Sequence, residues 1–171
     1  DFSQGSLLAS NSETAFAIEG DGFFAVHGAN EETYYTRNGD FNWAIGDNGG
    51  LVLCTAEGYP VLSTTNRPIT LSRQYEASKI TINGAGEVCY PDEQNNPMPI
   101  GVVVGLFQFR NPNGLDRVGD SLFAVSAGSG EPINEATNAN VKKSSINQGY
   151  LEVSNGSIVS EMVEMISVSR Q

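Results

Sequence analysis

The side chains that could carry out chemistry are few in this sequence, and they form no known catalytic pattern. His27 is the single histidine, so it would have to act as the base of any Ser-His-Asp arrangement. It follows Val26 in a segment typical of a strand, and no G-x-S-x-G nucleophile motif occurs in the chain. A lone histidine is far more often structural or exposed than catalytic. We therefore expect no catalytic residues and no enzymatic activity.

Two short motifs resemble parts of ligand-binding loops. Gly20-Asp21-Gly22 has two glycines, but a dinucleotide fingerprint needs a third glycine and a following helix. We interpret it instead as a tight turn before a strand whose Phe23 and Phe24 anchor opposite faces of a sheet. Asp47-Asn48-Gly49 resembles a fragment of a calcium loop that lacks the other ligands, and we interpret it as a hairpin turn. The sequence thus predicts no cofactor and no metal ligand.

The two cysteines, Cys54 and Cys89, are the remaining reactive side chains. They are too few and too far apart for a structural zinc site, which usually needs four ligands arranged as close pairs. They could form one disulfide in an exported protein. We favour two separate buried thiols that behave as small apolar side chains, because sequence spacing says nothing about the Cβ geometry that a disulfide requires.

Length and composition indicate an acidic, β-rich protein with one domain as the first expectation and two small domains as the alternative. Hydrophobic residues make up 39% of the 171 residues, and charged residues only 17%, with 19 glycines. The formal net charge of −11 disfavours binding to phosphate backbones and to anionic membranes. No apolar run approaches the roughly 18 to 20 residues that span a bilayer. We therefore expect no nucleic-acid partner and no membrane insertion.

Short runs of aromatic and β-branched residues between turn residues predict a mainly β fold, a complex single domain of hairpins. The predicted strands are Phe23–His27, Thr33–Arg37, Phe41–Ile45, Leu51–Cys54, Ile80–Ile82, Glu87–Tyr90, Ile100–Phe109 and Leu122–Val125. Asn-Gly pairs favour type I′ hairpin turns, and five occur, at Asn38-Gly39, Asn48-Gly49, Asn83-Gly84, Asn113-Gly114 and Asn155-Gly156. The stretch Ala127–Ser145, rich in Gly, Ser, Asn and Ala, is expected to be a long surface loop.

The last segment changes to a helical period. Its apolar residues recur at helical spacing after a potential cap at Ser157, namely Ile158, Val159, Met162, Val163 and Ile166. We therefore divide the chain into a β-rich domain, residues 1–156, and the start of a short C-terminal helix, residues 157–171. The chain begins at Asp1 with no initiator methionine and no signal peptide, and we expect it to be a piece of a longer protein.

Several blocks of sequence, in their order and spacing, resemble the flagellar basal-body rod and hook family and are most similar to its distal rod members. The blocks are Phe2-Ser3-Gln4-Gly5, Ala17-Ile18, Gly20–Phe24, Tyr35–Phe41, Gly50–Val52, Gly58–Val61, Phe107–Gly119, Gln148–Asn155, Glu161–Val163 and Met165-Ile166. Together they cover nearly the whole chain, although Ser63–Ser78 matches no block and two cysteines are unusual for the family.

The resemblance implies a structural function. It implies the outer domain of an axial subunit that self-assembles, through head-to-tail contacts, into the shaft that transmits torque from motor to hook. The implied partners are copies of the same chain in a helical polymer, adjacent rod and hook proteins, and the surrounding bushing rings. The implied location is the flagellar basal body, reached by type III export without a cleaved signal peptide.

The resemblance also implies a geometry. Long N- and C-terminal helices would form an inner tube, so the chain ends near Phe2 and near Ser157 should lie close together on one side of the domain. The motif residues are expected to determine the fold rather than to contact neighbouring subunits; they are Gly20, Gly22, Phe23, Phe24, Gly149 and Tyr150.

Two alternatives remain open. The chain could be a hook or proximal-rod member of the same family. It could also be a secreted β-module that binds carbohydrate through Tyr34, Tyr35 and Trp43, although cross-strand packing is the more common use of such rings. Clustered, exposed rings would favour the carbohydrate-binding module, and buried rings would exclude it.

Overall fold

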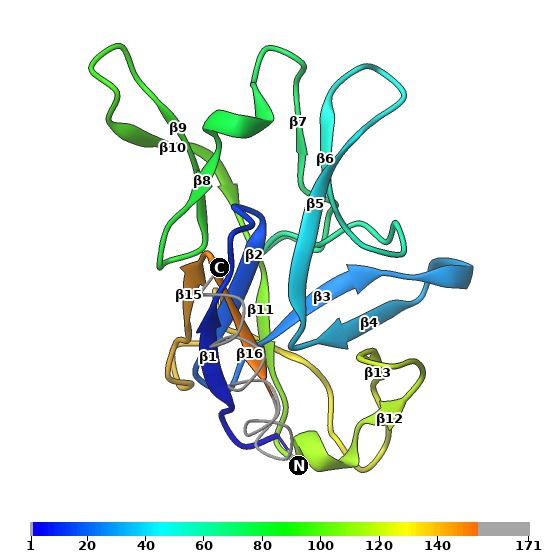
Figure 1. Cartoon of the computed structure of the whole chain (residues 1–171). Coiled ribbons are helices and arrows are strands. Elements are labelled where there is room, and N and C mark those ends of the chain that lie inside the picture. Colours follow the sequence, from blue (N-terminus) through cyan, green and yellow to red (C-terminus); the bar gives the residue numbers. More distant parts are fainter. Residues whose placement is uncertain (1, 154–171) are drawn as a thin grey trace, which may run out of the picture.

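The computed structural model describes residues 2–153, and the strands within them form antiparallel sheets (Figure 1). A mainly β fold is therefore confirmed. The predicted C-terminal helix over 157–171, its cap Ser157 and the pair Asn155-Gly156 lie outside the described residues.

Four sheets make up the described part of the chain. Their strand orders are β1-β16, β10-β9-β8, β12-β13-β4-β3-β11-β14 and β15-β2-β5-β6-β7. The strands are β1 (Ser6–Ala9), β2 (Ala15–Glu19), β3 (Phe23–His27), β4 (Thr33–Thr36), β5 (Gly39–Ile45), β6 (Leu51–Thr55), β7 (Thr70–Leu71), β8 (Thr81–Ile82), β9 (Glu87–Pro91), β10 (Pro97–Val103), β11 (Leu106–Gln108), β12 (Asp116–Arg117), β13 (Phe123–Ala124), β14 (Ile133–Asn134), β15 (Ser145–Gln148) and β16 (Tyr150–Val153). Short 3-10 turns lie at Ala29–Glu31, Ala77–Lys79 and Pro112–Gly114.

Strand β3 is central to the fold because both of its faces are buried. Phe24 and Val26 face the larger hydrophobic cluster, whereas Phe23 and Ala25 face the smaller one. Each of the two phenylalanines is 1% exposed. The prediction that they anchor opposite faces of a sheet is confirmed. Alternation along a strand explains it, since successive side chains point to opposite sides.

The Asn-Gly pairs form turns of a different kind from the predicted type I′. Positive φ at both residues defines that type, and none of the four described pairs has it; only Gly49 is positive, at 83°. Three of the four asparagine side chains instead accept hydrogen bonds from backbone N–H groups two residues on: Asn38 from Asp40, Asn48 from Gly50 and Asn83 from Ala85. The hairpins β5–β6 and β8–β9 are confirmed, but Asn38-Gly39 joins strands of two different sheets.

The predicted strand Ile100–Phe109 is wrong as a single element. It divides into β10 and β11, which belong to different sheets. Gly101 has φ of 92°, and the pairing register of β10 with β9 shifts between Pro99 and Val103. Gly105 lies so near the segment around Ser63 that a Cβ at position 105 would be 2.6 Å from the Ser63 carbonyl oxygen. An irregular strand and a close backbone approach bend the chain from one sheet to the next.

The segment Ala127–Ser145 is not simply a surface loop. It contains β14, which pairs with β11, and it buries Ser129 and Glu135. The Glu135 carboxylate accepts hydrogen bonds from the Gln108 side chain and from the backbone N–H and hydroxyl of Ser144. A buried carboxylate with several donors ties this segment to the six-stranded sheet.

Both ends of the described chain lie side by side. Strand β1 pairs with β16 in antiparallel register, with Ser6 opposite Val153 and Ala9 opposite Tyr150. This two-stranded ribbon lies along the body of the domain beside β2 (Figure 1). The expectation that the ends near Phe2 and Ser157 are close is not tested at Ser157, which is outside the described residues. Val153, the last described residue, pairs directly with Ser6, four residues after Phe2.

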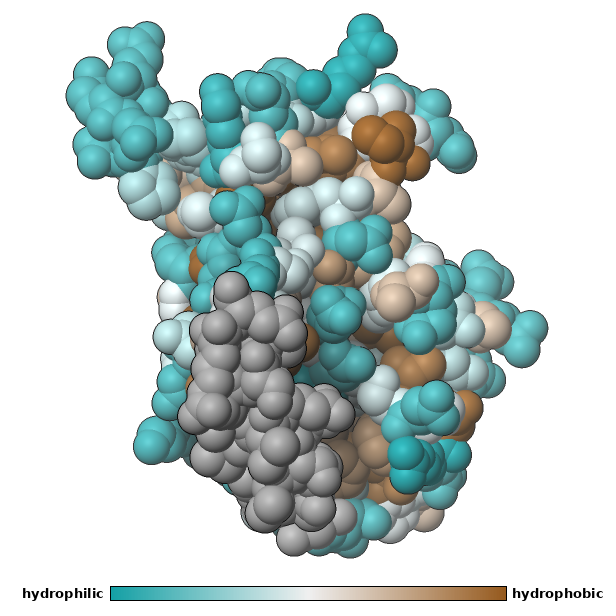
Figure 2. All heavy atoms as spheres, viewed as in Figure 1, coloured by the Kyte–Doolittle hydropathy of each residue, from teal (hydrophilic) through white to brown (hydrophobic). Residues whose placement is uncertain are grey.

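The β9–β10 hairpin projects from the body, and its tip is hydrophilic (Figures 1 and 2). β10 is an edge strand in its sheet. Pro91 and Pro97 face each other, and because neither has an N–H group they form a non-hydrogen-bonded pair. The backbone of Pro97, and that of Pro99 two residues on, therefore points to the free edge without offering a donor. Such an edge resists pairing with another strand.

We expect the double substitution Pro97→Thr, Pro99→Thr to cause concentration-dependent association, because it places two N–H donors on a free edge. Light scattering and size-exclusion chromatography over a range of concentrations would measure it. Met98→Thr is the control, since the Met98 backbone faces β9. A double variant that associates no more than the control would show that the prolines do not protect this edge.

Candidate functional site

The side chains that could do chemistry are dispersed in the fold. His27 ends β3 half-buried, and its backbone N–H donates to the Pro60 carbonyl at 2.8 Å. Within residues 2–153 no group of three or more His, Cys, Asp or Glu side chains could hold a metal ion. Gly20-Asp21-Gly22 forms the turn into β3, and Asp47-Asn48-Gly49 forms the β5–β6 turn.

Cys54 and Cys89 are both buried and unpaired with each other, so the prediction of two separate buried thiols is confirmed. Burial raises the pKa of each thiol, and the nearby Glu87 carboxylate raises the pKa of Cys89 further. A raised pKa reduces the thiolate fraction at neutral pH, and the thiolate is the reactive form. The fold therefore uses these cysteines as small apolar side chains.

The three rings of the carbohydrate-binding alternative do not form a common groove. Tyr35 is 5% exposed and packs edge-to-face on Phe107 and Phe109 in the smaller cluster. Tyr34 and Trp43 pack against the larger cluster instead. The sequence favoured packing as the use of these rings. The buried Tyr35 ring excludes the carbohydrate-binding alternative.

The buried Tyr35 predicts a loss of stability at alkaline pH. Burial, together with the Glu131 charge, raises the pKa of Tyr35 to about 12 from 10.0. A raised folded-state pKa means that the unfolded chain releases the proton first, so stability is full below pH 10 and falls as the pH rises from 10 toward 12. Urea unfolding of the protein and of Tyr35→Phe at several pH values between 8 and 11.5 would test this. An equal fall in the free energy of unfolding with pH for both proteins would contradict it.

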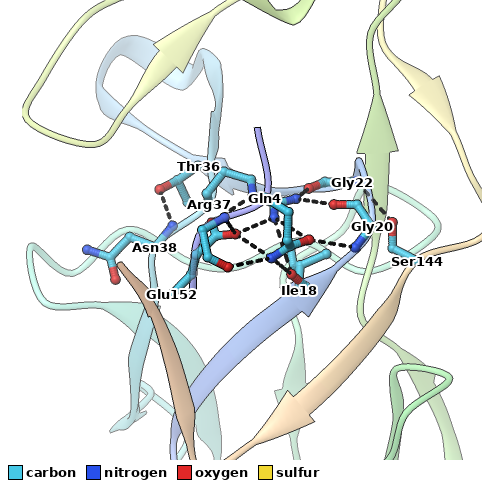
Figure 3. A network of polar contacts seen from close by, with 10 residues as sticks. Gln4, Ile18, Gly20, Gly22, Thr36, Arg37, Asn38, Ser144 and Glu152 are labelled. Atoms are coloured by element: carbon cyan, nitrogen blue, oxygen red, sulfur yellow. Dashed lines mark hydrogen bonds and ion pairs between the residues drawn. The ribbon is translucent and has the colours of Figure 1, made fainter. Parts of the chain in front are cut away.

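The most connected polar site lies where the β1–β16 ribbon meets the body (Figure 3). Arg37, just after β4, binds Glu152 of β16 through two nitrogens, Nε to Oε1 at 3.0 Å and Nη2 to Oε2 at 2.7 Å. The two side chains are 13% and 12% exposed. A bidentate pair with this degree of burial has far more geometric specificity than a surface ion pair.

The same guanidinium also binds the β2–β3 turn. It donates to the carbonyl oxygens of Gly20 at 2.7 Å, Gly22 at 2.5 Å and Ile18 at 3.2 Å. Its carbon lies 5.9 Å from the centre of the Phe23 ring. Arg37 therefore connects three parts of the chain that are distant in sequence.

Gln4 completes the network from the β1 side. Its side-chain nitrogen donates to Glu152 Oε2 at 2.6 Å and to the Ile18 carbonyl at 3.1 Å, and its oxygen accepts from the Gly20 backbone N–H at 3.0 Å. The Gly5 backbone N–H also donates to Glu152 at 3.0 Å. We call Gln4, Arg37 and Glu152 the ribbon clasp.

The clasp joins five of the blocks that carry the family resemblance: Phe2–Gly5, Ala17-Ile18, Gly20–Phe24, Tyr35–Phe41 and Gln148–Asn155. The sequence patterns of these blocks predict no role for Gln4, Arg37 or Glu152. One signal was available: Arg37 directly follows the aromatic and β-branched run of a predicted strand, in a chain with only nine basic residues.

The expected fold determinants divide into two groups. Gly20, Gly22, Phe23 and Phe24 all contact the clasp or the cores, and Gly149 has φ of 84° between β15 and β16. Tyr150 differs, because its side chain is 43% exposed and does not anchor a core.

None of the helices in the described part of the chain is long and apolar enough to cross a membrane.

Comparison with known proteins matches two family models to the chain. Residues 17–90 match the flagellar hook protein FlgE/F/G D1 domain, and residues 147–171 match the flagellar basal body rod FlgEFG protein C-terminal region. Between them they contain Arg37 and Glu152.

Curated relatives agree with these matches. A flagellar basal-body rod protein FlgG from Borreliella burgdorferi is 38% identical over 170 residues, 99% of this chain and 60% of the relative. The FlgG of Bacillus subtilis is 32% identical over 90% of this chain and 55% of the relative. A flagellar basal-body rod protein FlgF from Mesorhizobium japonicum is 31% identical over 97% of this chain and 61% of the relative. The chain spans about 60% of the length of such relatives.

Proposed function

Because the chain belongs to the flagellar basal-body rod and hook protein family, we propose that it is the outer domain of a distal rod subunit. The subunit assembles with copies of itself into a helical shaft in the basal body and transmits torque from motor to hook. The observation that carries the proposal is the pairing of β1 with β16, which brings the two ends of the described chain together. A domain inserted between two segments of one axial core needs this arrangement.

The contacts and route of the subunit form part of the same proposal. Adjacent rod and hook proteins are its axial neighbours, and the surrounding bushing rings face its outer surface. Head-to-tail contacts that do not close on themselves generate an open polymer. The proposal also divides the chain into an outer domain, residues 1–156, and the start of a helix, residues 157–171. It includes type III export and the lack of enzymatic activity.

The distal position is favoured over hook and proximal-rod positions by the relatives. FlgG proteins from several bacteria align over 90% or more of this chain at 30% to 38% identity. A FlgF protein aligns at 31%. The highest of these identities, 38%, belongs to a FlgG protein, which supports a distal rod subunit.

Electron microscopy of the full-length protein tests the proposal. The purified protein, with all residues that flank this chain in its natural sequence, should form straight rod-like polymers under assembly conditions. A strain that lacks it should be non-motile and have basal bodies that end before the hook. Monomers that persist under assembly conditions, together with normal motility of the deletion strain, would overturn the proposal.

A further inference from the structure

We propose that the ribbon clasp is the joint through which load passes between the β1–β16 ribbon and the body of the domain, with Arg37 as its positioning residue. This inference rests on the proposed function, because it assigns the torque-bearing role of the subunit to particular side chains. Its basis is the set of partners that Glu152 and Arg37 have in common.

Glu152 is the point at which both strands of the ribbon meet the body. It lies on β16, it accepts hydrogen bonds from Gln4 and from the Gly5 backbone on the β1 side, and it receives Arg37 from the body. A force applied along either strand therefore reaches the same carboxylate. Ribbon and body are also joined at the far end of the ribbon, where the Gly149 N–H donates to the Ala15 carbonyl at 2.7 Å.

Arg37 is well placed to resist rotation at this joint. It lies between β4 of the six-stranded sheet and β5 of the five-stranded sheet. Its planar guanidinium binds Glu152 on one side and the carbonyls of Gly20 and Gly22 on the other. A planar fork with several fixed bonds sets an angle as well as a distance, whereas an ammonium group acts as a point charge. Arg37 thus fixes the angle at which the ribbon meets the body of the domain.

The first variant to test is Arg37→Lys, which retains the charge but loses the fork. In polymers grown from the purified full-length protein, we expect the persistence length measured by electron microscopy to fall about two-fold or more. The matched control is Glu76→Gln, which removes the ion pair between Glu76 and Lys79 at 2.9 Å on the surface, where both side chains are more than half exposed. The control should leave the stiffness unchanged.

Two further variants keep the test decisive if Arg37→Lys folds poorly. Gln4→Ala removes the link to Glu152 and to the Gly20 N–H without leaving a charge unpaired, and it should also soften the polymer. The exchange Arg37→Glu with Glu152→Arg restores an ion pair, yet it should not restore stiffness, because the carbonyls of Gly20 and Gly22 need donors at position 37. If the joint were a simple ion pair, this exchange would restore the stiffness of the polymer.

The outcomes separate this inference from the proposed function. If the natural full-length protein forms no polymer, the proposed function fails. If it does polymerise but Arg37→Lys and Gln4→Ala polymers are as stiff as the natural ones, or the charge exchange restores stiffness, the inference fails and the proposed function stands. Softer polymers from both single variants, with an unchanged control and no rescue by the exchange, support the clasp as the joint.

Discussion

Substituting alanine for Gly39 should destabilise the domain severely. Gly39 begins β5 opposite Phe16 of β2, and a Cβ there would lie 2.0 Å from the Phe16 carbonyl oxygen and 3.0 Å from the Phe24 ring. The nearest atom belongs to backbone, so the two strands would have to separate. We expect a loss of about 4 kcal/mol or more in the free energy of unfolding, at the upper end of single-substitution effects.

The matched control is Gly84→Ala, because Gly84 also follows an asparagine. Its Cβ would have the Ile146 carbonyl oxygen as its nearest atom, at 3.9 Å, which is an ordinary contact. Both substitutions reduce the freedom of the unfolded chain in the same way. Urea unfolding should therefore place Gly84→Ala within about 1 kcal/mol of the natural protein. Equal stability of the two variants would show that β2 and β5 can move apart at no cost.

Phe24→Ala should be the most damaging truncation of a core side chain. Phe24 is 1% exposed, lies on the central strand β3 between β4 and β11, and packs edge-to-face on Phe41 with ring centres 4.9 Å apart. Removing such a ring costs about 3–5 kcal/mol, which includes the cavity that it leaves. A domain of this size has a total stability of about 5–15 kcal/mol, so the variant should lose a large share of it and unfold at a clearly lower urea concentration.

Phe123→Ala provides the comparison. Phe123 is only partly buried, on the short strand β13, where its ring lies 4.9 Å from that of Phe2. Thermal and urea unfolding should show a loss of about 1–2 kcal/mol for this variant. If both variants lose the same free energy, the two-sided burial of β3 would not be the main source of stability.

The local part of the fold could be predicted from the sequence. Phe23–His27 matches β3 at both ends, and the hairpins around Asn48 and Asn83 are present. Aromatic and β-branched runs between turn residues determine these elements within a few residues of sequence. The division of Ile100–Phe109 could not be predicted, because its cause is a close approach of Gly105 to Ser63, more than forty positions away.

Strands without a strong local pattern could not be found either. The sequence pattern did not predict β1, β2, β15 and β16, and these strands depend on partners at the other end of the chain. The clasp belongs to the same class. No local pattern indicates that Gln4 and Glu152 meet, and Arg37 acquires its role only when β2 and the β2–β3 turn present three carbonyls to it. Strand propensity depends on local sequence and does not indicate which distant segments pair.

The pairing of the first strand with the last sets the order in which this domain can fold. A chain leaves the ribosome, or any narrow channel, with its N-terminus first. Strand β1 pairs with β16, and β2 pairs with β15. Neither early strand can therefore complete its sheet until almost all of the domain has emerged. Contacts between such distant segments make folding slow, because the loop between them must close first. The arrangement therefore delays the completion of these two sheets until the last strands of the domain are available.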